Sequence, residues 1–121
     1  MSEEKSVEDQ IVEIIGWYRD LGEDYLGISE IMHNRKQLST LGAFLAVEMG
    51  KARKYWKLNE FAVRKLSNQK KIVLTKTMPA NKAEAYIKAN PFEEEEKAMK
   101  WEIVFYQREY LFKATKEVLS E

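Results

Sequence analysis

Apolar residues recur at helical spacing along almost the whole chain. Near the N-terminus, Ile11, Ile14, Ile15 and Tyr18 follow one another in steps that place them on one side of an α-helix. A second series with similar steps runs through the middle of the chain: Leu38, Leu41, Leu45, Met49, Ala52, Trp56 and Val63. The alternation with turn residues that marks β-strands does not occur. The pattern predicts an all-α fold of four to five helices.

Capping residues and prolines indicate where the helices begin and end. Ser6, with Asp9 three positions later, resembles a capping box and predicts the start of the first helix. Pro79 disfavours helix at the residue before it, so a break is expected there. Asn81 is then expected to cap a short helix that ends at Ala89.

The last predicted helix runs from Phe92 to about Ser120, after the break at Pro91. Four consecutive glutamates, residues 93–96, occupy its first turn. Negative charge at this end of a helix complements the helix dipole, so the run indicates a helix start in solvent.

The region between residues 28 and 78 contains no proline and only two glycines, Gly42 and Gly50. One helix over all of it would measure roughly 76 Å at about 1.5 Å per residue. A compact domain of this size has a radius of gyration of only about 14 Å. The helix therefore either breaks, with Ser39–Thr40 and Gly50 as candidate positions, or continues and buries its apolar side against partner chains.

We expect a single all-helical domain over residues 1–121. It comprises an acidic N-terminal helix (1–27), a basic helical region (28–78) with a long central helix, and a short helix followed by an aromatic-rich C-terminal helix (79–121). No stretch is apolar enough to span a bilayer, and the acidic N-terminus does not resemble a secretory signal. A cytoplasmic protein is expected.

Charge is segregated along the chain although the formal net charge is zero. Residues 1–30 carry nine acids and two bases, net −7; residues 31–82 carry twelve bases and two acids, net +10; the remainder is net −3. A cationic middle between acidic ends is a better guide to partners than the total charge.

The composition argues against catalysis and metal binding. The chain has no Cys and one His, His33, which excludes disulfides, thiolate metal sites and multi-histidine sites. No glycine-rich phosphate loop or nucleotide motif occurs. We therefore expect no enzymatic activity, no catalytic residues, no metal and no cofactor.

The densest basic stretch predicts a nucleic-acid interface. Basic residues at helical spacing would neutralise phosphates while an aromatic ring beside them stacks on bases, which suits single strands of any sequence. The alternative is a solvated basic face, or one paired with the acidic N-terminal helix. The candidate residues are Lys51, Arg53, Lys54, Tyr55, Lys57, Arg64, Lys65 and Lys71.

The last predicted helix is apolar nearly all round, which is typical of a helix buried on several sides. Met99, Ile103, Tyr106 and Tyr110 define one face, and further aromatic residues fall on others. A homo-oligomer would bury this surface, and a monomeric bundle with an aromatic core is the alternative. The candidate oligomerisation residues are Trp101, Phe105, Tyr106, Tyr110 and Phe112.

The order of these segments resembles that of the UvsY-type phage recombination mediators. The resemblance rests on an apolar helix (38–50), a basic stretch with aromatics (51–71), a segment containing Ala83-Glu84-Ala85 (75–86) and a charged aromatic helix (93–119). It implies a phage protein, working in an infected bacterial cell, that forms helical oligomers, binds single-stranded DNA and assists a recombinase on strands coated by single-strand-binding protein. In that family pattern, Lys51 and Arg53 correspond to a basic pair that precedes the aromatics.

The sequence supports a second functional hypothesis. The aromatic C-terminal helix and the acidic N-terminal segment also fit a helical protein–protein interaction or inhibitor module, such as a phage anti-defence or assembly factor.

Overall fold

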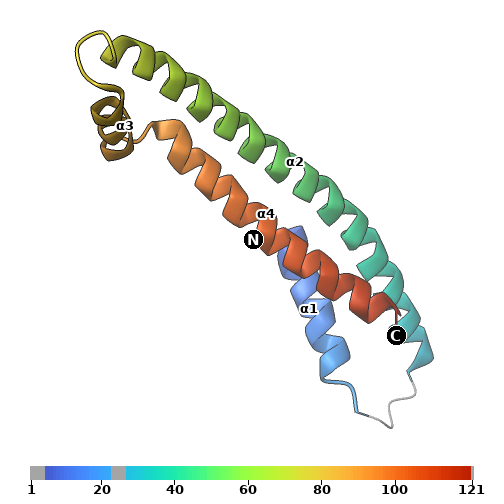
Figure 1. The fold of residues 1–121 in the computed structure, drawn as a ribbon. Helices are drawn as coiled ribbons and strands as arrows, with labels where there is room; N and C mark the ends of the chain where they lie inside the picture. The colour runs from blue at the N-terminus through green and yellow to red at the C-terminus, as the bar shows by residue number, and fades with distance from the viewer. Residues whose placement is uncertain (1–4, 23–26, 121) are drawn as a thin grey trace. The chain divides into compact units, whose positions relative to one another are not determined.

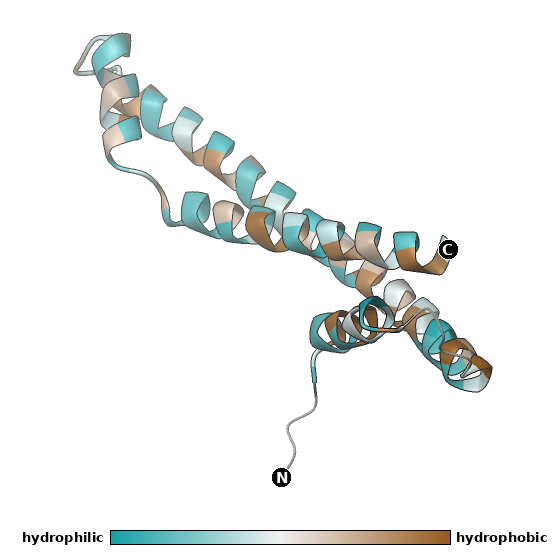
Figure 2. Ribbon diagram, turned by 90° about the horizontal axis from the view of Figure 1, so that it is seen from below, coloured by the Kyte–Doolittle hydropathy of each residue, from teal (hydrophilic) through white to brown (hydrophobic). Residues whose placement is uncertain are grey.

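A computed structural model describes residues 5–22 and 27–120 of the chain. Over these residues the chain forms four helices and no strand: α1 (Val7–Arg19), α2 (Ile28–Leu74), α3 (Ala80–Ala89) and α4 (Glu93–Ser120) (Figure 1). The all-α prediction is confirmed for this part of the chain. Hydrophobic and hydrophilic positions are interspersed along the helices, as Figure 2 shows.

The helix ends test the capping predictions. The Ser6 hydroxyl accepts a hydrogen bond from the Asp9 amide at 3.1 Å, which confirms the cap of α1. The predicted cap at Asn81 is wrong, because α3 already begins at Ala80 with Pro79 in the N-cap position. Pro79 has extended backbone angles that suit an N-cap, whereas the Asn81 side chain accepts from the Lys82 amide inside the helix.

Helix α2 is continuous through both positions where a break was considered. The Thr40 hydroxyl donates to the Lys36 carbonyl at 3.2 Å, one turn back, so it leaves the backbone helical. Gly50 also stays in helical conformation. Of the two alternatives for this region, the long helix is the one observed, and it ends at Leu74 rather than at residue 78.

The chain divides into two compact units, residues 1–51 with 105–121 and residues 52–104. In the first unit, α1 and the beginning of α2 contribute the buried core of Ile11, Ile14, Leu38, Leu41 and Leu45. The end of α4 packs against this core through Leu111, Phe112, Val118 and Leu119. The apolar series predicted for both α1 and the beginning of α2 therefore does face a core.

Polar contacts connect the three helices of the first unit. Arg108 on α4 pairs with Glu8 on α1 at 3.1 Å and donates to the Glu48 carbonyl on α2 at 2.9 Å. The Tyr18 hydroxyl donates to the Ile31 carbonyl at 2.8 Å. Burial raises the pKa of the Tyr18 hydroxyl, so it keeps its proton and remains a donor.

The second unit contains the rest of α2, all of α3 and the beginning of α4. Its buried hydrophobic side chains, among the described residues, are alanines: Ala52, Ala83 and Ala98. The Lys71 ammonium group on α2 pairs with the Glu84 carboxylate on α3 at 2.7 Å. Small residues at buried positions allow helices to approach closely but bury little apolar surface themselves.

Gly42 provides a test of the packing in the first unit. A Cβ atom at Gly42 would lie 3.3 Å from the Thr115 methyl carbon, and Thr115 is buried. A Gly42→Leu chain should lose about 1–3 kcal/mol of unfolding free energy, because the added side chain overpacks this contact.

Gly50 is the matched control, since it lies in the same helix and a Cβ there meets no atom within 4 Å. Gly50→Leu should be neutral or stabilising by up to about 0.8 kcal/mol, because leucine favours helix over glycine. Urea denaturation measures both changes. Equal stability of the two variants would contradict the described packing.

Candidate nucleic-acid interface

The predicted strand-binding residues all lie on α2, and most of them are exposed. Lys51 belongs to the first unit, and the other seven belong to the second. Arg53, Lys54 and Lys65 are exposed, as are Lys57 and Arg64. The structure therefore leaves five of the predicted cations on the surface of one unit.

Two of the predicted cations take part in ion pairs on their own helix. The Lys51 ammonium lies 3.3 Å from the Glu48 carboxylate, and the Lys57 ammonium lies 3.8 Å from the Glu60 carboxylate. Exposed pairs of this kind contribute little to stability, up to about 1 kcal/mol. Lys57 can therefore leave Glu60 for a phosphate at low cost.

Lys71 differs from the other predicted cations because its ion pair joins two helices, α2 and α3. Its hydrogen bond and positive charge lower the pKa of the Glu84 carboxyl. Glu84 thus stays ionised down to a lower pH, and the pair weakens only as the pH falls through that lowered pKa. In the structure, Lys71 is therefore engaged with Glu84, and its predicted contact with a phosphate stays a prediction.

Among the predicted cations of the second unit, four form no ion pair with another described residue: Arg53, Lys54, Arg64 and Lys65. Glu60 is the one carboxylate in α2 beyond Ala52, and it is half-buried. The exposed surface of this part of α2 is therefore strongly positive. The sequence left open that acids of the same protein neutralise the basic face. For these four cations, no such pairing is present in the part of the chain that the structure describes.

The two aromatic residues predicted to stack on bases have contacts within the protein. The Tyr55 ring lies 4.9 Å from the Trp101 ring, centroid to centroid, at an interplanar angle of 32°. The half-buried Trp56 ring has the Lys57 ammonium 4.0 Å from its centroid. Both rings therefore have contacts within the second unit, and Tyr55 is 44% exposed beside its contact with Trp101.

Phe61 is an exposed aromatic residue that the sequence pattern did not single out. Its side chain is 62% exposed. It lies about 180° around the helix from the buried Ala52, at roughly 100° per residue. The sequence contained a signal for Phe61: Ala52 belongs to the apolar series that was expected to be buried, so the opposite side of the helix is the side expected to face outward. We call Arg53, Lys54, Lys57, Phe61, Arg64 and Lys65 the α2 face.

The predicted oligomerisation residues on α4 have different environments. Trp101 is half-buried against the Tyr55 ring, and Phe112 packs on the core of the first unit. Phe105 and Tyr106 form an edge contact with centroids 5.4 Å apart. Tyr106 and Tyr110 are 52% and 78% exposed. The chain itself therefore covers part of the predicted aromatic surface and leaves the two tyrosines accessible.

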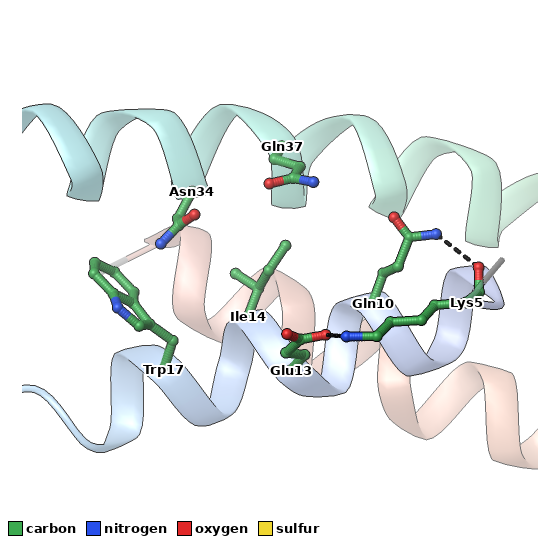
Figure 3. A pocket seen from close by; sticks show the side chains of 7 residues that line it. All are labelled: Lys5, Gln10, Glu13, Ile14, Trp17, Asn34 and Gln37. Atoms are coloured by element: carbon green, nitrogen blue, oxygen red, sulfur yellow. Dashed lines mark hydrogen bonds and ion pairs between the residues drawn. The ribbon is translucent and has the colours of Figure 1, made fainter. Parts of the chain in front are cut away.

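A hollow of about 760 Å³ lies between α1 and α2 in the first unit (Figure 3). Within the hollow, Lys5 and Glu13 pair at 2.5 Å, and the Gln10 amide donates to the Lys5 carbonyl at 2.9 Å. The one cation that lines it is thus bound to the one carboxylate, and the hollow offers no positive charge for a strand. Its lining residues are Lys5, Gln10, Glu13, Ile14, Trp17, Asn34 and Gln37.

The described residues include no group of three or more His, Asp or Glu side chains placed to hold a metal ion. His33 lies on the exposed side of α2. In the part of the chain that the structure describes, no helix combines the length and the apolar character that crossing a membrane requires.

No protein-family model, curated protein or solved structure matches this chain. The resemblance to the UvsY-type mediators therefore stays a prediction from the segment pattern.

The contact between Tyr55 and Trp101 can be tested by a double-mutant cycle. If the rings stabilise the second unit, Tyr55→Leu and Trp101→Leu should show a coupling energy of about 0.5–1.5 kcal/mol in urea denaturation. Phe61→Leu is the control, because its exposed side chain should change stability by less than about 0.5 kcal/mol. Zero coupling would mean that the two rings do not support each other.

Proposed function

We propose that this protein binds single-stranded nucleic acid, without sequence preference, through the α2 face. The observation that supports the proposal is the composition of that face: five exposed cations surround an exposed phenylalanine, and the single carboxylate of this part of α2, Glu60, pairs with only one of them, Lys57. The proposal changes the site expected from sequence by replacing Tyr55 and Trp56 with Phe61 as the stacking residue.

The cations supply affinity through the phosphates. Lys54 and Lys65 flank Phe61 in sequence by seven and four residues, and Arg64 lies three residues after it. On a helix, Lys54 therefore lies roughly two turns from Phe61, and Lys65 and Arg64 each lie roughly one turn from it. The three charges are thus near the ring. A strand that contacts them releases counterions, which makes its binding strongly salt-dependent.

Phe61 supplies a surface for a base. A single aromatic ring stacks on any of the bases, because each has a π-face, and the contact is worth about 1–3 kcal/mol per base. Double-stranded DNA does not expose these faces. The combination of an exposed ring with cations therefore favours single strands over duplexes.

A role in recombination, with a recombinase or single-strand-binding protein as partner, is a further part of this proposal. It is supported by the resemblance in segment order to the UvsY-type mediators.

Binding of a labelled oligothymidine tests the proposal by fluorescence anisotropy across a salt series. Lys54→Gln with Lys65→Gln should reduce the slope of log affinity against log salt by about 0.7 for each phosphate that is no longer neutralised. Phe61→Ala should weaken binding about 5- to 150-fold, while Phe61→Trp, which retains a ring, should preserve it.

The control replaces cations of the same unit that are engaged elsewhere. Lys97 and Lys100 on α4 pair with Glu93 at 3.4 Å and Glu96 at 3.3 Å. Lys97→Gln with Lys100→Gln removes two charges but should leave the salt slope unchanged. The proposal fails if native protein does not bind the oligonucleotide at low salt, or if this control lowers affinity as much as the α2 variant.

A further inference from the structure

The second unit has an apolar groove of about 430 Å³ between α2 and α4. Trp56 and Val63 from α2 and Ala98 and Met99 from α4 contribute its apolar surface. Met99 is 62% exposed beside the groove. An apolar groove between two helices is suited to the apolar positions of a third helix.

The rim of this groove is acidic. Glu60, Glu95 and Glu102 line it, together with one cation, Arg64. Glu95 and Glu102 form no ion pair with another described residue, although their neighbours on α4 do: the carboxylate just after Glu95 pairs with Lys100. Half-buried carboxylates beside an apolar surface favour a cationic partner there.

The opposite side of α2 has the matching chemistry. Lys54, Leu58, Phe61, Lys65 and Ile72 follow one another in steps of four, three, four and seven, the spacing of a helix–helix seam. The three apolar members, Leu58, Phe61 and Ile72, are 53%, 62% and 63% exposed. This α2 seam combines apolar side chains with lysines, whereas the groove combines apolar side chains with glutamates.

We propose that the α2 seam of one copy docks in the acidic groove of a second copy. The charges are complementary, and docking removes the apolar side chains of both surfaces from water. Seam and groove are different surfaces of one unit, so the contact is head-to-tail and leaves each copy able to bind a further one. The proposal deepens the expectation of a homo-oligomer and does not rest on nucleic-acid binding.

The docked seam includes Lys54, Phe61 and Lys65, which also belong to the α2 face. Self-association and strand binding therefore compete for the same side chains. An oligothymidine that occupies the α2 face should dissociate the assembly.

Charge exchange tests the docking by sedimentation velocity at low and high salt. Native protein should associate at low salt, and Glu95→Lys with Glu102→Lys (the groove variant) or Lys54→Glu with Lys65→Glu (the seam variant) should weaken association tenfold or more, because like charges then meet. Mixing the two variants should restore association, since the intact seam of one meets the intact groove of the other. The chain with all four substitutions should associate again, because its reversed seam and reversed groove are complementary.

Glu93→Lys with Glu96→Lys is the matched control, because it reverses two charges on the same helix outside the groove. This control should associate as the native protein does, and circular dichroism verifies that every variant is helical. Reassociation of the fourfold variant also excludes unfolding as the reason why each twofold variant stays dissociated.

Strand binding is measured separately, so the two proposals can fail independently. The groove variant should still bind oligothymidine, because its α2 face is unchanged. The docking proposal is overturned if native protein stays monomeric up to millimolar concentration at low salt, if either reversed variant associates normally, or if the fourfold variant does not associate. A monomer whose groove binds a lysine-rich peptide would identify another protein as the occupant and would also overturn it.

Discussion

The second unit exposes large apolar side chains because its buried positions are occupied by small residues. Ala52, Ala83 and Ala98 are its buried hydrophobic residues in the described part of the chain, and each contributes a single methyl group. Small side chains permit close helix contacts, but the free energy gained by burial scales with the apolar area removed from water. Larger apolar residues of the unit, such as Phe61 and Met99, remain at the surface.

The two units stabilise their helices by different means. The first unit has a core of branched aliphatic residues from α1 and α2, with Arg108 joining three helices through charged hydrogen bonds. The second unit relies on ring contacts and on the ion pair between Lys71 and Glu84. Exposed ion pairs contribute little, so the second unit has more to gain from a partner than the first.

Much of the fold could be predicted from the sequence, because helical periodicity and local capping depend on neighbouring residues. The apolar series correctly identified Leu38 and Ala52 as buried, and Ser6 correctly identified the first cap. The start of α3 was missed because Pro79 satisfies the N-cap geometry two positions before Asn81, a residue with stronger capping preference. Here the fixed backbone of proline outweighed the side-chain preference of asparagine.

The candidate site was harder to predict than the fold. The spacing of residues shows which of them share a side of α2. Which of these sides is buried depends on where the partner helix packs, and spacing does not show that. Tyr55 was expected to face a ligand and instead contacts Trp101 from α4, a residue 46 positions away in sequence. Phe61 is a candidate because the structure buries Ala52, which leaves the opposite side of α2, where Phe61 lies, exposed to solvent.

The contact between Gly42 and Thr115 also constrains how α4 aligns with α2 in the first unit. Leu111 and Leu119 lie one turn before and one turn after Thr115, and both are larger. Sliding α4 by a turn would bring a leucine to the place where the threonine methyl now lies, only 3.3 Å from the point that a Cβ atom would occupy at residue 42. Gly42 and Thr115 thus define a single register for the helix pair. If α4 packed out of register during folding, a leucine would overpack this contact, and the misaligned pair would be unstable.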